Sequence, residues 1–330
     1  MRAIAVANAA PATVESLTAP GASNPAEGIM PRWIKLTLVV LSAQLIIAAQ
    51  NPDTQARIVV TVEAHKGAAT PQITSADVMV YENNHRKRVT GLTPIRDDGA
   101  GVQLWVLIDD GTDTSLGLQL DDLRKFIRDQ PGNTQVGVGY LRNGTVAPVQ
   151  GLTSDRELAA KALRLPLGAP GISASPYLSL IDLIHRWPAS PQAHEVLLIT
   201  SGIDPDYGAG PSNPYLSRAI ETAQRAGVVV YSIYFGSEGH AGHSYWQINW
   251  GQNYLSQLGD ETGGEFYWQG SSNPISFAPY LKEISERLRE QYVITFDPGG
   301  EGKAGFQAIK LKTEIAHVTL VGPSKVYAGK

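Results

Sequence analysis

The chain has 330 residues, 43% of them hydrophobic, so it is longer than one typical domain and can bury a sizeable core. It contains no cysteine, which excludes disulfides, thiolate catalysis and cysteine-ligated metals. A formal net charge of -4 gives no electrostatic basis for nucleic-acid binding, and we expect none.

The N-terminal region carries a targeting pattern. Residues 1–29 are rich in Ala, Pro and Ser with little periodicity, which indicates a disordered tail or a start assigned too far upstream. Residues 30–49 combine two positive charges, an apolar run and small residues at the end, the order typical of a secretory signal. We expect translation to begin at Met30 and cleavage near Ala49, giving a periplasmic or extracellular protein. The alternative is a single-pass membrane anchor formed by residues 33–49.

Short β-branched segments flank the middle of the chain. Residues 50–98 contain "ARIVVTVEA", "DVMVYEN" and "RVTGL", and residues 291–330 contain "QYVITF", "GFQAIKLKT" and "HVTLVG". Each group offers about three short strands, too few for an independently stable sheet. We therefore expect the two segments to pair into one small β-domain, with the middle of the chain inserted between them. The basic run "HRKR" within the first group is typical of a solvated hairpin end.

The middle of the chain, residues 99–290, alternates apolar strands with amphipathic helices. The segments "VQLWVLID", "HEVLLITSG" and "VVVYSIYF" predict buried strands, and "TQVGVGYL" with "TVAPVQGL" predicts a hairpin. One helical face is predicted to carry Leu116, Leu120, Leu123, Phe126 and Ile127. Three further helices are predicted: one begins with a capping pattern at Ser154, one begins near Pro176, and one ends at Gly227. The sequence thus predicts an α/β fold: a doubly wound, mostly parallel sheet with helices on both faces.

The first predicted strand ends unusually, in the acid and hydroxyl residues of "LIDDGTDTSLG". Over residues 102–290 it is followed by "QVGVGYLRNGTVAPVQGLTSDRELAAKAL", "VLLITSG" and "LSQLGDETGGEFYW". This succession resembles a von Willebrand factor type A (VWA) domain. The flanking "DVMVYEN" and "QYVITFDP" stretches resemble one bacterial subgroup, the acidobacterial-type VWFA-related proteins.

The resemblance implies a metal-ion-dependent adhesion site formed by three loops at the carboxyl edge of the sheet. Such a site holds Mg²⁺, with Mn²⁺ or Ca²⁺ as alternatives, through hard oxygen ligands, and an acidic group of a protein partner completes the shell. The matching positions are Asp110, Thr112 and Thr114 in the first loop and Ser173, or less well Ser175, in the second. In the third loop Ser201 stands where the family has aspartate, and Asp204 or Asp206 would have to substitute.

Three interpretations of these residues remain open. They form a degenerate but working cation site, they are the remnant of one on a face that still binds a partner, or they only cap helices. Asp, Thr and Ser before a helix are favoured N-caps whatever their function.

Two further features bear on function. "GISAS" resembles a nucleophile elbow but lacks its final glycine and an assignable histidine, so a serine hydrolase is the weakest hypothesis. A glycine-rich stretch that is predicted to be a loop contains three large aromatic residues, Tyr245, Trp246 and Trp250. If these side chains are exposed, they favour partner binding. The alternative is that they are buried against the sheet.

The sequence therefore predicts an exported, non-enzymatic VWA-type protein-binding module that uses its carboxyl-edge loops. The alternative is a structural or assembly protein of the cell envelope with a vestigial metal site, in which the β-domain makes the contacts.

Overall fold

A computed structural model describes residues 55–65, 68–96, 99–169, 171–236, 244–298 and 304–329. Contacts group Pro52–Lys330 into one compact unit. The predicted tail at residues 1–29 and the predicted signal or anchor at residues 30–49 lie outside the described residues. Within the described ranges, no helix is both long and apolar enough to cross a membrane.

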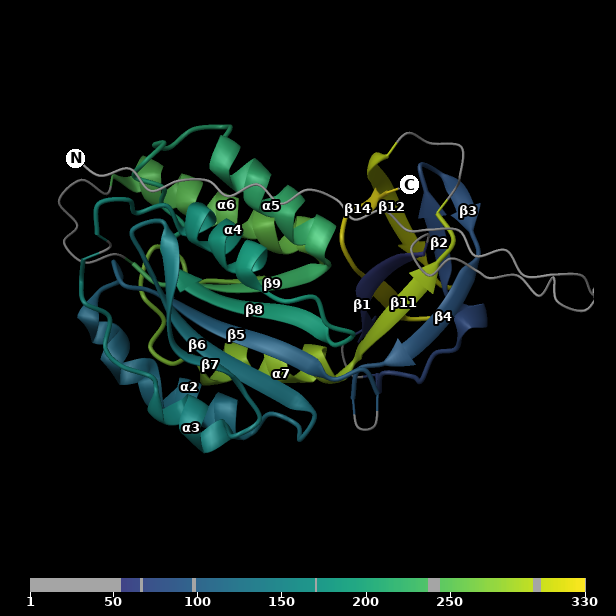
Figure 1. Ribbon diagram of the computed structural model, residues 1–330, viewed down its shortest axis with the longest axis horizontal. Helices are drawn as coiled ribbons and strands as arrows, with labels where there is room; N and C mark the ends of the chain where they lie inside the picture. Colours follow the sequence, from purple (N-terminus) through teal and green to yellow (C-terminus); the bar gives the residue numbers. More distant parts are fainter. Residues whose placement is uncertain are drawn as a thin grey trace, which may run out of the picture. The chain divides into compact units, whose positions relative to one another are not determined.

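A six-stranded sheet in the order β10-β9-β8-β5-β6-β7 lies between two layers of helices (Figure 1). Its strands are β5 (Val102–Asp109), β6 (Thr134–Arg142), β7 (Thr145–Thr153), β8 (Ala193–Thr200), β9 (Val228–Tyr234) and β10 (Phe266–Tyr267). Neighbouring strands are parallel except β7, which pairs antiparallel with β6 at one edge. Numbered from β5, this is the order 3-2-1-4-5-6 of a doubly wound sheet. The predicted α/β class is confirmed.

Helices cover both faces because alternate strand residues point to opposite sides of the sheet. Leu104, Val106 and Ile108 of β5 belong to one core, and Trp105 and Leu107 belong to the other. The first core is covered by the 3-10 helix η3 (Thr114–Gln119) and by α2 (Leu120–Arg128), α3 (Arg156–Lys161) and α7 (Ala278–Arg289). The second is covered by α4 (Pro176–Arg186), α5 (Pro214–Ala226) and α6 (Tyr245–Thr262).

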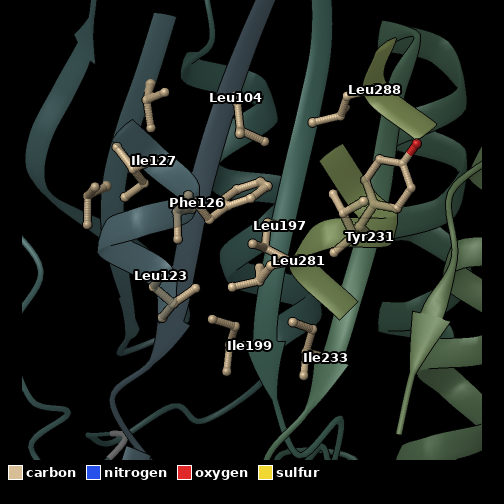
Figure 2. Packing of buried hydrophobic residues seen from close by; sticks show 14 of the residues in the cluster. Leu104, Leu123, Phe126, Ile127, Leu197, Ile199, Tyr231, Ile233, Leu281 and Leu288 are labelled. Carbon is tan, nitrogen blue, oxygen red and sulfur yellow. The ribbon is translucent and has the colours of Figure 1, made fainter. Parts of the chain in front are cut away.

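The helical face predicted from the periodicity is buried as a whole. Leu116, Leu120, Leu123, Phe126 and Ile127 all belong to the first core. Figure 2 shows Leu123, Phe126 and Ile127 lying over the sheet near Leu281 of α7. One local prediction was wrong: α3 is capped by Asp155, whose side chain accepts a hydrogen bond from the Leu158 amide, and not by Ser154.

Two four-stranded antiparallel sheets, β13-β1-β11-β4 and β14-β12-β2-β3, combine strands from both ends of the described chain. The first segment supplies β1 (Ala56–Ala64), the 3-10 helix η2 (Ser75–Asp77), β2 (Met79–Glu82), β3 (His85–Lys87) and β4 (Val89–Pro94). The last supplies β11 (Gln291–Phe296), β12 (Gly305–Lys312), β13 (Val318–Val321) and β14 (Lys325–Ala328). Pairing of β1 with β11 and of β2 with β12 ties the two segments together.

The antiparallel sheets join the α/β layer at the amino ends of its parallel strands. Val59, Ile95 and Val293 belong to the same core as Leu104. Arg57 donates hydrogen bonds to the carbonyls of Pro191 and Gln192, just before β8 begins. The loops at the carboxyl ends of the parallel strands therefore lie away from this junction.

Candidate functional site

Three loops meet at the carboxyl edge of the six-stranded sheet, as expected for an open α/β fold. They are residues 110–113 after β5, residues 162–169 and 171–175 between α3 and α4, and residues 201–213 after β8. The Ala169 amide donates to the Asp110 carbonyl at 2.9 Å, which ties the second loop to the first. Ser175 Oγ donates to Asp204 Oδ2 at 2.9 Å, which ties the second loop to the third.

Asp110, the leading predicted metal ligand, is bound within the protein by Arg164. The two guanidinium Nη atoms donate to the two carboxylate oxygens at 2.7 and 2.9 Å, and the Leu167 amide donates to Oδ1 at 3.3 Å. The Arg164 guanidinium lies 3.6 Å from the centre of the Tyr140 ring. The Tyr140 hydroxyl donates to the Arg164 carbonyl at 2.6 Å. An internal cation thus already occupies both oxygens of Asp110, which is 1% exposed.

Asp109, the last residue of β5, is equally occupied. Its Oδ1 accepts from the Gly111 amide and its Oδ2 from the Thr200 hydroxyl, both at 2.8 Å. Burial raises the pKa of Asp109 to about 6, although these two hydrogen bonds lower it and the neighbouring Asp110 charge raises it further. The carboxyl group therefore links the first loop to the end of β8 without facing solvent.

The predicted hydroxyl ligands of the first loop, Thr112 and Thr114, lie in a tight turn. Thr112 is buried, and its Oγ1 donates to the Asp109 carbonyl at 2.7 Å. Thr114 begins η3 on the exposed side of that turn, and Asp113 caps η3 by accepting from the Ser115 amide at 2.7 Å. This segment behaves as a capped turn before a helix.

The acids of the third loop reach back to the second loop, which spacing in the sequence could not reveal. Asp204 is buried and accepts from Ser175 Oγ, from Asn213 Nδ2 at 3.0 Å and from the Asp206 amide at 3.1 Å. Ser173, the predicted second-loop ligand, donates instead to Asp206 Oδ2. These pairs join the caps of α4 and α5.

Of the five predicted metal ligands, four are therefore already hydrogen-bonded within the protein: Asp110, Thr112, Ser173 and Asp204. Asp110 faces Arg164, Thr112 faces a backbone carbonyl, and Asp204 faces the helix caps. In the part of the chain that the structure describes, no group of three or more His, Asp or Glu residues could hold a metal ion. Sequence reasoning missed Arg164 because it lies 54 residues from Asp110 and no local motif marks it.

The aromatic stretch begins a helix, so the prediction of a loop was wrong. Ser244 and Gln247 form a capping box, which starts α6 at Tyr245. Residues four apart then stack along one side of the helix. Trp246 lies 5.6 Å from Trp250, and Trp250 lies 5.8 Å from Tyr254, measured between ring centres. Trp250 packs partly buried against the second core, whereas Tyr245 and Trp246 are 77% and 58% exposed.

Exposed apolar side chains gather at the carboxyl edge. Of the eleven large hydrophobic side chains that are exposed in the described residues, all but Val149 and Leu158 lie on carboxyl-edge segments. The nine are Leu118, Leu165, Leu167, Ile172, Tyr207, Tyr245, Trp246, Trp268 and Ile275. We call this set the carboxyl-edge patch. Its segments adjoin: Gln119 donates to the Ile275 carbonyl at 3.0 Å, and the Asp113 amide donates to the Gly236 carbonyl at 2.9 Å.

No protein-family model matches the chain, and no curated protein sequence matches it. Solved structures similar to it include a von Willebrand factor type A protein from Catenulispora acidiphila, at 11% identity and a TM-score of 0.40, with 86% of this chain and 75% of that chain covered. The ArnB paralogue VWA2 from Sulfolobus acidocaldarius also has 11% identity and a TM-score of 0.40, with 84% and 76% covered. BatB from Bacteroides thetaiotaomicron has 12% identity and a TM-score of 0.38, with 57% and 97% covered.

These similarities are distant and carry no argument about function. The order and direction of the strands in the six-stranded sheet decide the fold. The chain has a doubly wound α/β fold, as the sequence predicted.

Proposed function

We propose that this chain is an exported, non-enzymatic protein-binding module that recognises a protein partner through its carboxyl-edge patch without a metal ion. The observation that supports this is the concentration of exposed apolar side chains on segments at one edge of the sheet. Soluble proteins seldom expose large contiguous apolar patches unless these bind something.

Individual residues of the patch have the chemistry of binding anchors. Ile172 is 99% exposed, Ile275 is 88% exposed and Leu118 is 82% exposed, so each has almost its whole side chain free to bury on binding. Trp246 stands on a helix and is held from one side by Trp250, which limits the conformational entropy that binding would remove. Tryptophan and tyrosine in such settings dominate binding energies.

The internal ion pair supports recognition that does not depend on a metal ion. Asp110 is bound by Arg164, and Asp204 is bound by Ser175 and Asn213, so the two buried carboxylates of these loops already have partners within the protein. Leu165 and Leu167 of the patch contact this neutralised pair through their backbones, so we expect an apolar rather than an acidic partner surface.

A crosslinking experiment tests the proposal. A photo-reactive amino acid is placed at Ile172 in one variant and, as a matched control, at Leu158 in another, since Leu158 is exposed and apolar but lies on α3 outside the patch. We expect one discrete protein adduct from position 172, undiminished by a chelator and lost on adding Trp246→Asp. Equal adducts from both positions, or an adduct abolished by the chelator, would refute it.

The runner-up function, an assembly protein of the cell envelope, is favoured by a groove in the antiparallel part. This groove has a volume of about 860 Å³ and is lined by Thr90, Leu92 and Thr93 of the edge strand β4. An uncharged edge strand beside an open groove can accept an added strand from a partner. A photo-reactive residue at Thr90 that gives the only adduct would favour this function over the first.

A further inference from the structure

A cavity of about 430 Å³ lies at the amino-end side of the parallel strands, between the start of β1, the loop before β8, the end of α5 and β14. Arg57, Trp187, His194, Arg225 and Tyr327 are among the residues that line it. None of its described lining residues is Asp or Glu. The cavity therefore has positive charge in its wall and no carboxylate facing it.

Arg57 has no carboxylate partner in the described parts of the chain. Its Nη2 donates to the carbonyls of Pro191 at 2.6 Å and Gln192 at 3.0 Å. Burial lowers the pKa of Arg57, as expected for a cation without a counter-ion. By contrast, Arg164 and Arg287, which are also partly buried, each pair with a carboxylate. A partly buried arginine of this kind is a candidate to bind an anion from solution.

Arg225 supplies a second cation to the lining of the cavity. Its guanidinium lies 3.6 Å from the centre of the Tyr327 ring and 5.3 Å from that of Phe306. Stacking occupies the face of the guanidinium and orients its plane, while the N–H groups around its edge stay available as donors. No described carboxylate lies within ion-pair distance of it.

His194 also lines the cavity. It is 7% exposed and stacks on Trp187, with ring centres 4.6 Å apart. Its Nε2 is buried without a hydrogen-bond partner among the described residues, which is uncommon in a folded protein. Burial and the nearby Arg57 charge lower the pKa of His194 to about 4, so the imidazole is neutral near pH 7.

We propose that this cavity is a binding site for a small oxyanion, the carboxylate, sulfate or phosphate group of a small molecule, held by Arg57 and Arg225 against the Trp187–His194 pair. The two guanidinium groups provide charge-assisted donors, and the stacked rings provide an apolar wall for the remainder of the ligand. The site is separate from the carboxyl-edge patch and does not depend on the function proposed for it.

Calorimetric titration of the full chain tests the proposal. Sodium acetate, sulfate and phosphate are each titrated against sodium chloride of matched ionic strength, and the ranking of the three identifies the oxyanion class. We expect saturable one-to-one binding of at least one of them. Arg57→Gln and Arg225→Gln should each weaken it at least about tenfold, the loss of a charge-assisted hydrogen bond.

Arg218→Gln is the matched control, because Arg218 lies on the same helix but does not line the cavity. It should change the affinity by less than about twofold. If Arg57→Gln fails to fold, Arg225→Gln decides alone, since Arg225 is exposed and its substitution leaves the core intact. Absence of saturable binding for all three anions, or an equal loss in Arg218→Gln, would overturn the proposal.

Discussion

The guanidinium of Arg164 binds both carboxylate oxygens of Asp110, at 2.7 and 2.9 Å, in the loop where the VWA resemblance implies a divalent cation. A fork-shaped cation from the second loop therefore stands beside the carboxylate of the first loop. This pairing neutralises the acid from within the fold, which supports the proposal that apolar groups carry recognition at this edge.

The first prediction concerns the stability of this pair. Arg164→Ala should lower the free energy of unfolding by about 2–3 kcal/mol, because it leaves the buried Asp110 carboxylate without its cation. The loss is not larger because Arg164 is partly exposed, so that water can replace some of the lost interaction. Urea denaturation measures the change. Arg128→Ala, which breaks the exposed pair with Glu157, should cost less than about 1 kcal/mol, and equal losses in both variants would contradict the assignment.

The second prediction concerns cations. Titration of Mg²⁺ and then Mn²⁺ into the chelator-treated chain should give no saturable heat and no rise in melting temperature, because the oxygens of Asp110 and Asp204 are already engaged. One-to-one cation binding that disappears in Asp110→Ala would show that the Arg164 pair opens for a metal ion and would restore the metal-dependent interpretation.

The third prediction concerns pH. Burial raises the pKa of Asp109 to about 6, whereas an aspartate in an unfolded chain titrates near about 4. Between these values the folded state holds a proton that the unfolded state has lost, so this group makes the protein less stable as pH rises from about 4 to about 6. The loss is at most about 3 kcal/mol.

Asp109→Asn removes this dependence, so the unfolding free energy of the wild type should fall relative to that of the variant across that interval and then level off. Two other groups titrate in both proteins. The raised pKa of Glu195 changes stability in the same direction as that of Asp109, and the lowered pKa of His194 changes it in the opposite direction. Comparison of the wild type with Asp109→Asn therefore isolates the contribution of Asp109. Parallel stability curves from chemical denaturation at a series of pH values would contradict the prediction.

The fourth prediction separates folding from recognition on α6. Trp250→Ala should cost about 2–4 kcal/mol of stability, since the indole packs against the second core and between Trp246 and Tyr254. Trp246→Ala should cost less than about 1 kcal/mol because the side chain is largely exposed. Thermal unfolding distinguishes the two. A large loss in Trp246→Ala would mean that this residue serves packing rather than partner binding.

The hydrophobic periodicity and the helix-ending residues were enough to predict the strands and helices of the α/β fold. The apolar runs of β5, β8 and β9 are buried on both faces, as their lack of alternation predicts for a covered parallel sheet. Gly227 adopts the left-handed conformation that ends α5. These features depend on residues near one another in the chain, and for that reason the sequence determines them.

The site was less predictable because its contacts join loops that are distant in sequence. The chain order predicts that the segments around Asp110, Ser173 and Asp204 meet at the carboxyl edge. It does not say that Asp204 pairs with Ser175 and Ser173 with Asp206, because that depends on the path of each loop. Likewise, the capping box that starts α6 could be found from Ser244 and Gln247, but the exposure of Trp246 could not.

The sequence by itself thus determined the α/β class, the strand and helix order and the edge of the sheet where oxygen-bearing side chains gather. Only the tertiary structure decided what those side chains bind. Local periodicity records whether a residue faces the core, whereas the partner of a buried charge is whichever group the fold brings within about 3 Å. For Asp110 that group is Arg164, 54 residues away.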